Sequence, residues 1–531
     1  MNTNTTDFES LSLSNPGTER GWKSKLGLGL GFLGLFILLL AFFEINLPNQ
    51  SLFLTISLLS IAVGIVFYTL DLYKNHPAGI KNNGVWLKDF TNGGTWAWIL
   101  GVVLTIFYVL LYWFPETVGQ GASGKANSGL VALFDPLSQL LKNQPASQWF
   151  VYGVLYTLAI LGLGIKFIYK YRHNKYQIVR TISVMFFQLG FAFLLPEFLL
   201  RLNQPFNDFK NMWPLNYYFF DEWHLKELIN SGGMGIFMLV FGIAMIFIIS
   251  PILTYFYGKR WYCSWVCGCG GLAETAGDPF RQLSNKRLSA WKFERWLIHA
   301  VLVFSVLMTI AVIFTFLTRN PELSIITRDQ FTWGISIFLL LVAGVIYLFK
   351  KDGFDKNIRN IILSIVVIIV GVLLINTFSD AKNIFFIESY KLRSWYGFAV
   401  GSAFSGVIGV GFYPLLGNRV WCRFGCPMAA ILGLQQRLFS RFRITTNGGQ
   451  CISCGNCSTY CEMGIDVRSY AQRGENIVRS SCVGCGICSA VCPRGVLKLE
   501  NGSLENRINS DAVLLGNDVD LLSLIRNQKS A

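Results

Sequence analysis

The sequence predicts an α-helical polytopic membrane protein that carries a cysteine-rich α+β domain near its C-terminal end. Of the 531 residues, 53% are hydrophobic and only 14% are charged, whereas about 25% are charged in an average soluble domain. Apolar stretches of about 20 residues, the length of a helix that crosses a bilayer, recur along the chain. All 13 cysteines lie between Cys263 and Cys492. This clustering indicates ligands of a bound group rather than scattered core residues.

The basic excess of the chain does not point to nucleic acid. There are 45 Lys and Arg against 30 Asp and Glu, which gives a net charge of +15. Membrane proteins gather basic residues in their cytoplasmic loops whatever their function. No basic stretch carries a motif that reads nucleic acid. We therefore expect membrane lipid, and not nucleic acid, to surround this protein.

Ten membrane spans are expected after a polar, disordered N-terminal segment over 1–24. Six belong to a first membrane region at 25–257 and four to a second at 297–416, separated by a cytoplasmic loop at 258–296. Each span is long enough to cross the hydrocarbon as a helix. They lie near 26–45, 51–70, 96–114, 149–169, 179–200, 234–257, 297–317, 331–349, 360–378 and 396–416.

The basic residues predict which side each loop faces. With the N-terminus inside, the inner segments and adjoining helix ends before residue 417 hold 22 Lys or Arg, and the outer segments hold 10. The positive-inside rule then places both the N-terminus and the C-terminal domain in the cytoplasm. The outer segments at 115–148 and 201–233 are too short to fold alone as cofactor domains. The aromatic residues of the second suggest a hairpin on the membrane face or, alternatively, a docking surface.

Two cysteine runs near the C-terminal end carry the strongest chemical signal. Each has the spacing Cys-x2-Cys-x2-Cys-x3-Cys, and the second repeats the first at an offset of 31 residues. Three closely spaced thiolates bind three corners of a [4Fe-4S] cluster, and the fourth cysteine binds the other cluster of the pair. One cluster is therefore assigned to Cys451, Cys454, Cys457 and Cys492, and the second to Cys482, Cys485, Cys488 and Cys461.

These runs predict a two-cluster bacterial-type ferredoxin domain over 448–502, between a linker at 417–447 and a polar tail at 503–531. Four-thiolate zinc sites are the alternative, since paired cysteine motifs also build those. Two complete runs and the closing Cys492-Pro493 favour clusters. Cys461 is instead followed by Glu462. This departure removes no ligand.

A second cysteine pattern is duplicated at an offset of 159 residues. Gly258-Lys-Arg-Trp-Tyr-Cys263-Ser-Trp-Val-Cys267 matches Gly417-Asn-Arg-Val-Trp-Cys422-Arg-Phe-Gly-Cys426. Each copy follows a span that ends in the cytoplasm, so the two should lie at one membrane level. Four thiols from the matched copies could close a third metal or Fe-S site, to which Cys269 offers a weaker fifth ligand. The alternative is that these are buried structural cysteines.

Basic residues accompany both copies of the duplicated pattern. Lys259, Arg260, Arg419 and Arg423 would lower the pKa of the thiols and offset the charge of a bound group. If the copies form one site, Arg260 and Arg419 are expected to flank it symmetrically.

Several other cofactors and sites are not expected. Only His299 among the four histidines lies within a span, whereas a membrane haem with two histidine ligands needs a matched pair. No dinucleotide or phosphate-binding glycine motif occurs. His299 is expected to be a packed residue. Glu197 is a weaker candidate for a quinone or proton site and is more simply explained as an interfacial carboxylate.

With the duplicated Cys-x3-Cys pairs and the twin ferredoxin runs, the chain resembles membrane polyferredoxins of the NapH, NosR and CcoG kind. The resemblance covers about 234–500 and implies electron transfer at the bacterial inner membrane. Two features differ: Cys267-Gly-Cys269 stands where the family usually has Cys-Pro, and the first 230 residues are longer than NapH or CcoG needs. NosR-like members carry an outer flavin domain, and no flavin is expected here because neither outer segment is large enough.

The sequence thus predicts an electron-transfer subunit rather than a stand-alone enzyme. Two cytoplasmic [4Fe-4S] clusters would exchange electrons with a quinone or a periplasmic reductase or oxidase partner. A copper or cofactor maturation factor is the first alternative, because the Cys-x3-Cys thiolates could bind a soft metal. A redox-sensing regulator is the second alternative.

Overall fold

The computed structural model describes residues 21–45, 47–74, 88–121, 125–349, 356–378, 383–385, 387–502, 514–515 and 519–520. Most of the predicted N-terminal segment 1–24 and tail 503–531 lies outside these ranges. Within them, nine helical segments are long and apolar enough to cross a membrane. The chain is therefore a multi-pass membrane protein, as predicted.

Six of these segments are continuous helices: α1 (Trp22–Phe42), α2 (Gln50–Leu72), α4 (Thr95–Trp113), α7 (Gln148–Lys170), α15 (Leu288–Arg319) and α16 (Arg328–Phe349). A seventh is α17 (Lys356–Phe378). The other two contain a π-helical turn: α8 (Lys175–Phe186), η2 (Phe187–Leu194) and α9 (Leu195–Arg201), then α11 (Gly233–Ala244), η3 (Met245–Ile249) and α12 (Ser250–Tyr257). The seventh segment begins at Leu288, inside the stretch expected to be a loop up to residue 296.

Polar residues fix where several spans begin. Asn49, Ser147 and Asn174 each accept a hydrogen bond from the backbone N–H three residues on, at the starts of α2, α7 and α8. Such N-caps satisfy donors that would otherwise be unpaired at the helix end. The spans begin at these caps because the apolar run that follows each one can only remain helical in lipid.

The tenth predicted span, 396–416, is not one continuous helix. The chain forms α18 (Ser389–Tyr396), a long π-helical segment η7 (Gly397–Ile408) and, after a turn, α19 (Tyr413–Leu416). Glycines let neighbouring rings reach this backbone, since a Cβ on Gly406 would lie 2.6 Å from the ring of Tyr112. π-Helical turns of this kind often accompany functional sites.

Short helices at the two membrane ends complete the helical part. One set follows α12: α13 (Arg260–Cys263), α14 (Gly268–Thr275) and η4 (Asp278–Leu283). The matching set after α19 is η8 (Trp421–Gly425) and α20 (Pro427–Phe439). The remaining short elements are α3 (Lys88–Thr91), η1 (Pro115–Val118), α5 (Gly129–Leu133), α6 (Asp135–Lys142), α10 (Glu222–Asn230) and η5 (Pro321–Leu323).

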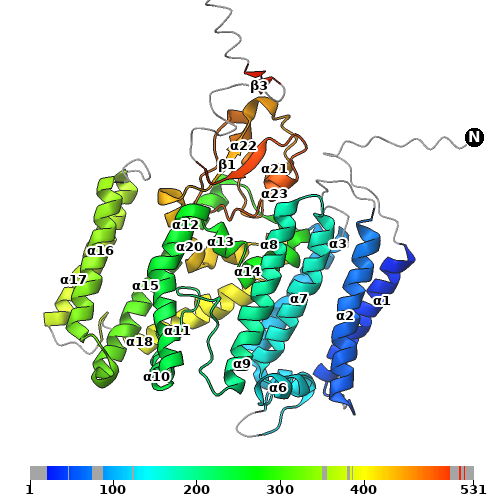
Figure 1. Cartoon of the computed structure of the whole chain (residues 1–531), viewed down its shortest axis with the longest axis horizontal. Helices are drawn as coiled ribbons and strands as arrows, with labels where there is room; N and C mark the ends of the chain where they lie inside the picture. The colour runs from blue at the N-terminus through cyan, green and yellow to red at the C-terminus, as the bar shows by residue number, and fades with distance from the viewer. Residues whose placement is uncertain are drawn as a thin grey trace, which may run out of the picture.

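The ferredoxin domain stands on one end of the helical bundle (Figure 1). Its strands β1 (Arg443–Thr446) and β2 (Leu497–Glu500) pair antiparallel, with Arg443 opposite Glu500. Between them lie η9 (Gly448–Gln450), α21 (Asn456–Thr459), α22 (Val467–Arg473) and α23 (Ile487–Ala490). A separate pair, β3 (Leu514–Leu515) and β4 (Val519–Asp520), follows.

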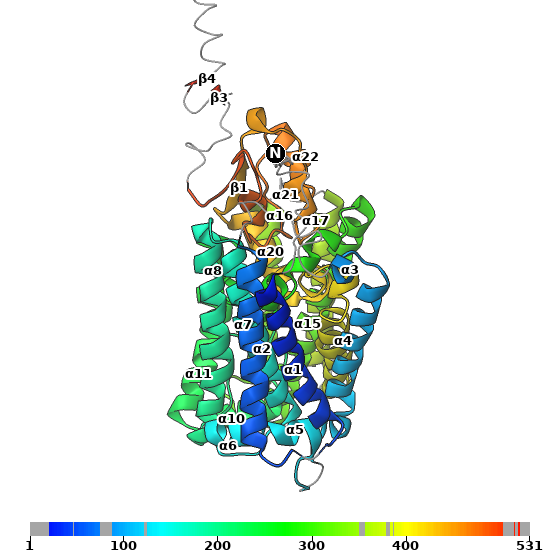
Figure 2. The ribbon, with the colours of Figure 1, turned by 90° about the vertical axis from the view of Figure 1, so that its right-hand side faces the viewer.

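The outer segments lie at the end opposite the ferredoxin domain. Figure 2 shows α5, α6 and α10 together at that end, with α3 near the other. Aromatic residues of the segment 201–233 pack onto the bundle: the indole N–H of Trp213 donates to Thr309 Oγ1 at 2.8 Å, and Tyr217 contacts Gly401. Trp223 remains 56% exposed. Most of these aromatics therefore join this segment to the helices.

Candidate metal centre

The first predicted ligand set comes together around one small cavity. Cys451, Cys454, Cys457 and Cys492 all line it, with Pro493 beside them. Burial raises the pKa of the Cys457 thiol to about 12, and the thiolates of Cys492, Cys454 and Cys451 raise it further. The fourth cysteine of the second run thus faces the first run, as the crossed assignment requires.

The second predicted set converges in the same way. Burial raises the pKa of the Cys488 thiol, and the neighbouring thiolates of Cys485, Cys482 and Cys461 add to the effect. Cys461 accepts hydrogen bonds from the backbone N–H groups of Ile465 and Met463. These bonds would stabilise its thiolate form when a metal is bound.

The two runs keep their repeat in three dimensions. Gly455 and Gly486 occupy equivalent places, each as the N-cap of a short helix, with φ of 80° and 76°. Residues with side chains rarely adopt this left-handed conformation. These glycines let each loop turn around the space that its thiols enclose.

The spacing of the sulfurs fits a cluster better than a zinc ion. Among the residues that the structure describes, no three of the thiols lie within 4.8 Å of one another. A tetrahedral zinc ion with bonds of roughly 2.3 Å would bring four sulfurs to about 3.8 Å apart. Four thiolates in a wider arrangement are the ordinary ligands of a four-iron cluster. The donor set therefore fits [4Fe-4S] clusters.

The duplicated pairs face each other beneath the ferredoxin domain. Cys263 ends α13 and Cys267 is the N-cap of α14, while Cys422 lies in η8 and Cys426 is the N-cap of α20. All four are buried in one hydrophobic cluster. Burial raises the pKa of Cys426, and then the thiolates of Cys422, Cys263 and Cys267 do so. The structure thus brings both pairs together, although neither pair lies on a single helix face.

Cys269 is the fifth thiol of this group. Its hydrogen bond to Cys267 lowers the pKa of Cys267, with burial acting in the opposite direction. Cys269 also lines a cavity together with Cys422.

The expected symmetry of the two arginines is wrong. Arg419 lies beside the thiols: its Nη1 is 3.6 Å from Cys422 Sγ and 3.3 Å from the carbonyl oxygen of Cys263. Arg260 instead donates to Asn501 Oδ1 at 2.9 Å and lies 4.6 Å from the centre of the Phe442 ring. The symmetry is lost because the ferredoxin domain packs against the Arg260 side only.

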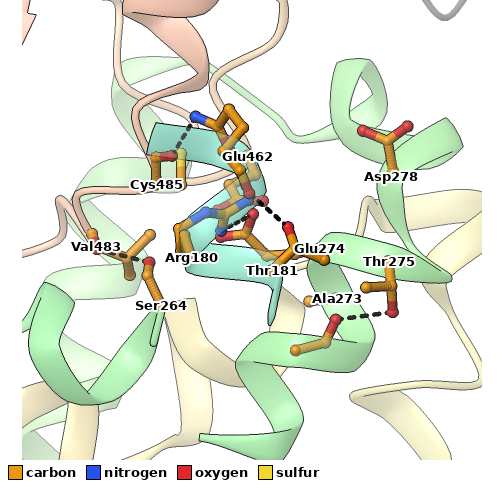
Figure 3. A network of polar contacts seen from close by, with 12 residues as sticks. Arg180, Thr181, Ser264, Ala273, Glu274, Thr275, Asp278, Glu462, Val483 and Cys485 are labelled. Carbon is orange, nitrogen blue, oxygen red and sulfur yellow. Dashed lines mark hydrogen bonds and ion pairs between the residues drawn. The ribbon is translucent and has the colours of Figure 1, made fainter. Parts of the chain in front are cut away.

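A buried charge network joins the ferredoxin domain to the duplicated segments. Glu462 accepts from Arg281 at 2.7 Å and from Asn418 at 3.1 Å, and it lies 3.0 Å from Arg419 Nε. On the other side of the arginines, Glu274 pairs with Arg419 at 2.5 Å and also with Arg180 (Figure 3). The network therefore reaches from the residue after Cys461 to the residue three before Cys422.

Cations hold two further carboxylates of the network in the ionised form. Asp278 pairs with Lys170 at 2.6 Å and with Arg281 at 2.8 Å. Burial would raise the pKa values of Asp278 and Glu274, but the surrounding Lys and Arg side chains outweigh it and lower both to about 2. The carboxylates of Glu274 and Glu462 also lie within 4.8 Å of Cys485. Because arginines already bind both carboxylates, this group is a junction rather than a metal site.

Sequence reasoning missed Arg180, Glu274 and Arg281. Charged residues buried at the level of membrane helices are rare and mark functional sites. Glu462, in the place that Pro493 takes in the second run, was the available signal.

Two weaker candidates have ordinary partners. Glu197 lies 3.4 Å from Lys142 Nζ, and His299 Nδ1 lies 2.5 Å from the carbonyl oxygen of Arg295. Neither residue lies among the thiols described above.

Family models and a curated relative match the cysteine-rich regions. A model described as a 4Fe-4S dicluster domain matches residues 450–497. A second, described as a 4Fe-4S binding domain, matches both duplicated regions, at 237–287 and 398–445. The protein YccM of Escherichia coli (strain K12), whose curated name gives it a proposed role in electron transport, is 23% identical over 229 residues. These findings fit a membrane polyferredoxin.

The relative limits what can be transferred to this polyferredoxin. The match covers 43% of the chain and 48% of YccM, so the chain spans about half the length of the curated relative it matches. No solved structure matches the chain. The comparisons bear out an iron–sulfur membrane protein related to an electron-transport protein.

Proposed function

We propose that this polyferredoxin is a bacterial inner-membrane electron-transfer protein. Its ferredoxin domain, on the cytoplasmic side, would hold two [4Fe-4S] clusters and exchange electrons with a quinone or a periplasmic partner. The main support is that thiols of the ferredoxin domain, thiols of the duplicated pairs and an aromatic cavity lie in succession along the molecule. When bound, the clusters would accept and release single electrons.

The first step of this succession is a fixed contact. Four side chains of the membrane part hydrogen-bond to backbone carbonyls of the loop 482–485: Tyr176, Gln177, Ser264 and Gln436, at 2.8–2.9 Å. Electron transfer weakens steeply with distance, so a rigidly held loop favours it. These contacts hold the second ligand set against the segment that carries Cys263.

The second step leads from the paired thiols into the bundle. A cavity of about 180 Å³ begins at Cys269 and Cys422 and is lined by several tyrosines, among them Tyr112, Tyr152 and Tyr156. Trp421 Nε1 and Asn418 Oδ1, on two of its lining residues, are buried and lack a hydrogen-bond partner among the described residues. An aromatic ring with carbonyl oxygens could use both the donor and the acceptor. This chemistry favours a quinone as one redox partner.

Copper handling is the second candidate function, and one observation favours it. Five thiols, those of Cys263, Cys267, Cys269, Cys422 and Cys426, gather in one buried region. Soft thiolate ligands of this kind select Cu(I). A maturation factor for a copper-containing oxidase would use this region as its metal site.

Metal analysis and EPR of the purified full-length protein test the proposal. Electron transfer requires iron and acid-labile sulfide, cluster signals on reduction with dithionite, and reoxidation of the reduced protein by a soluble quinone analogue. Stoichiometric copper on the paired thiols, with no reoxidation by the quinone, would favour maturation instead. Protein that contains neither iron nor sulfide after anaerobic purification would exclude the proposed electron transfer.

A further inference from the structure

A large basic cleft lies where the ferredoxin domain meets the membrane helices. Its volume is about 460 Å³, and Lys or Arg side chains from four segments line it: Lys259, Lys286, Arg295, Arg423, Arg437, Arg473 and Arg479. Glu294 and Asp466 are the two carboxylates in its lining. This imbalance of charge requires an explanation.

The acidic residues do not neutralise the cleft. Glu294 is bound to Arg423 at 2.6 Å, and Asp466 accepts a hydrogen bond from Ser458. Arg423 is 3% exposed, and its Nη2 is buried without a hydrogen-bond partner in the part of the chain that the structure describes. A buried, unpaired donor of a guanidinium is costly unless something accepts from it.

Two further guanidinium groups lie over one ring at this cleft. The Arg479 guanidinium is 4.8 Å and the Arg295 guanidinium 5.1 Å from the ring centre of Trp291. Their cationic groups are thereby held in place without acidic partners of their own among the described ion pairs. This arrangement keeps positive charge available to a ligand.

The cleft also has an apolar side that meets the lipid-facing surface. Leu288, Trp291 and Ile298 of α15 contribute to its lining, and α15 continues from there as a membrane span. On the same first turns, Phe293 and Trp296 are each 60% exposed. Exposed aromatics at a helix end are typical of the membrane–water interface. The site therefore combines cations with an apolar edge at headgroup depth.

We propose that this cleft binds the phosphate-containing headgroup of an anionic phospholipid. The cations would hold the phosphate, with Arg423 Nη2 as a donor, and the glycerol and first acyl carbons would lie against Leu288 and Ile298. Basic pockets between membrane helices are known to suit such headgroups. A soluble phosphate would use the cations but gain nothing from the apolar edge.

Retention of phosphatidylglycerol by the full-length protein tests this site. The protein is placed in nanodiscs of phosphatidylcholine with increasing phosphatidylglycerol, and native mass spectrometry counts the bound anionic lipid. The double variant Arg295→Gln/Arg479→Gln should weaken binding of the tightest phosphatidylglycerol about thirtyfold, given roughly 1 kcal/mol for each cation near the surface. The double variant Arg287→Gln/Lys292→Gln is the control.

The control removes the same charge from the same helix end, at residues that are exposed and do not line the cleft. It should change binding less than twofold, and both variants should keep their iron content. Equal weakening in both variants would mean non-specific attraction and overturn the proposal. It would also be overturned if inorganic phosphate alone competed as well as the lipid, or if the cleft variant lost iron rather than lipid. These outcomes leave the electron-transfer proposal untouched.

Discussion

The carboxylate of Glu462 lies 3.0 Å from Nε of Arg419, and both side chains are fully buried. Glu462 follows a predicted ligand of the ferredoxin domain, and Arg419 approaches Cys422 of the duplicated pairs. One ion pair thus connects the two groups of thiols. A proline in the place of Glu462 would preserve a ferredoxin turn but lose this connection.

Replacing Glu462 with Gln should loosen the ferredoxin domain from the membrane part. The change leaves Arg281 and Arg419 buried with too little negative charge, and breaking such a pair costs about 3–5 kcal/mol. Hydrogen exchange of the backbone over 482–488 should accelerate while the domain keeps its iron. Glu475→Gln, which removes an exposed partner of Arg473, should leave exchange unchanged. Equal exchange in both variants would show that the buried pair does not hold the domain.

Cysteine substitutions should remove the two predicted clusters one at a time. The two complete ligand sets predict about eight iron and eight sulfide per chain from the ferredoxin runs. Cys454→Ser and Cys485→Ser should each lose about four iron, and Cys485→Ser should also destabilise the domain, because cluster binding is part of its folding. Quantitative iron analysis with EPR provides the measurement. An unchanged iron count in the protein with both substitutions would refute the assignment.

The ferredoxin ligands could be predicted because their spacing is local. Residues at i, i+3 and i+6 belong to one loop, and the structure brings Cys492 to the first run and Cys461 to the second. The spans were predictable for a similar reason, since each needs only its own apolar residues. The break in the tenth span was missed because average hydropathy does not register the glycines that admit Tyr112 to the backbone.

The charge network could not be predicted because its partners are distant in sequence. Arg419 and Glu274 are 145 residues apart, and no periodic pattern relates them. The false symmetry of Arg260 and Arg419 has another cause. A repeat in sequence predicts equal environments, but a domain that packs on one copy makes them unequal.

The duplicated pairs should hold a third site. Because both duplicated regions match a 4Fe-4S binding model, we expect total iron of about twelve per chain if that site is a four-iron cluster. Cys267→Ser/Cys426→Ser should then lower it to about eight without changing the ferredoxin signals. Cys269→Ser serves as the comparison and should retain the iron of all three sites if Cys269 is only a spare ligand. A purified protein with eight iron both before and after the double substitution would favour structural cysteines.

Stability should fall with acidification as the network carboxylates are protonated. The pKa values of Glu274 and Asp278 are lowered to about 2, against roughly 4 for such groups in an unfolded chain. A depressed pKa contributes stability that is present above the unfolded value and is lost as pH falls toward the folded value. Each carboxylate should therefore contribute about 2–3 kcal/mol at neutral pH, lost between about pH 4 and pH 2.

The thermal midpoint of the full-length protein between pH 6 and pH 3 measures this dependence. Glu274→Gln should lower the midpoint at pH 6 and flatten its fall at lower pH. Glu475→Gln should leave both the midpoint and its slope as they are in the unaltered protein. If Glu274→Gln and the unaltered protein fell in parallel, the ionised form of Glu274 would not support the fold.

Reporter fusions should place the ferredoxin domain in the cytoplasm. Clusters are assembled in the reducing cytosol, and the Lys and Arg residues of the loops favour the same side. A fluorescent protein that folds only inside the cell, fused after residue 500, should fluoresce, and alkaline phosphatase at the same point should be inactive. Sandwich fusions within 115–148, at the opposite end of the bundle (Figure 2), should give the reverse pattern. Active phosphatase after residue 500 would invert the topology, and it would place the basic cleft and the predicted clusters on the periplasmic side.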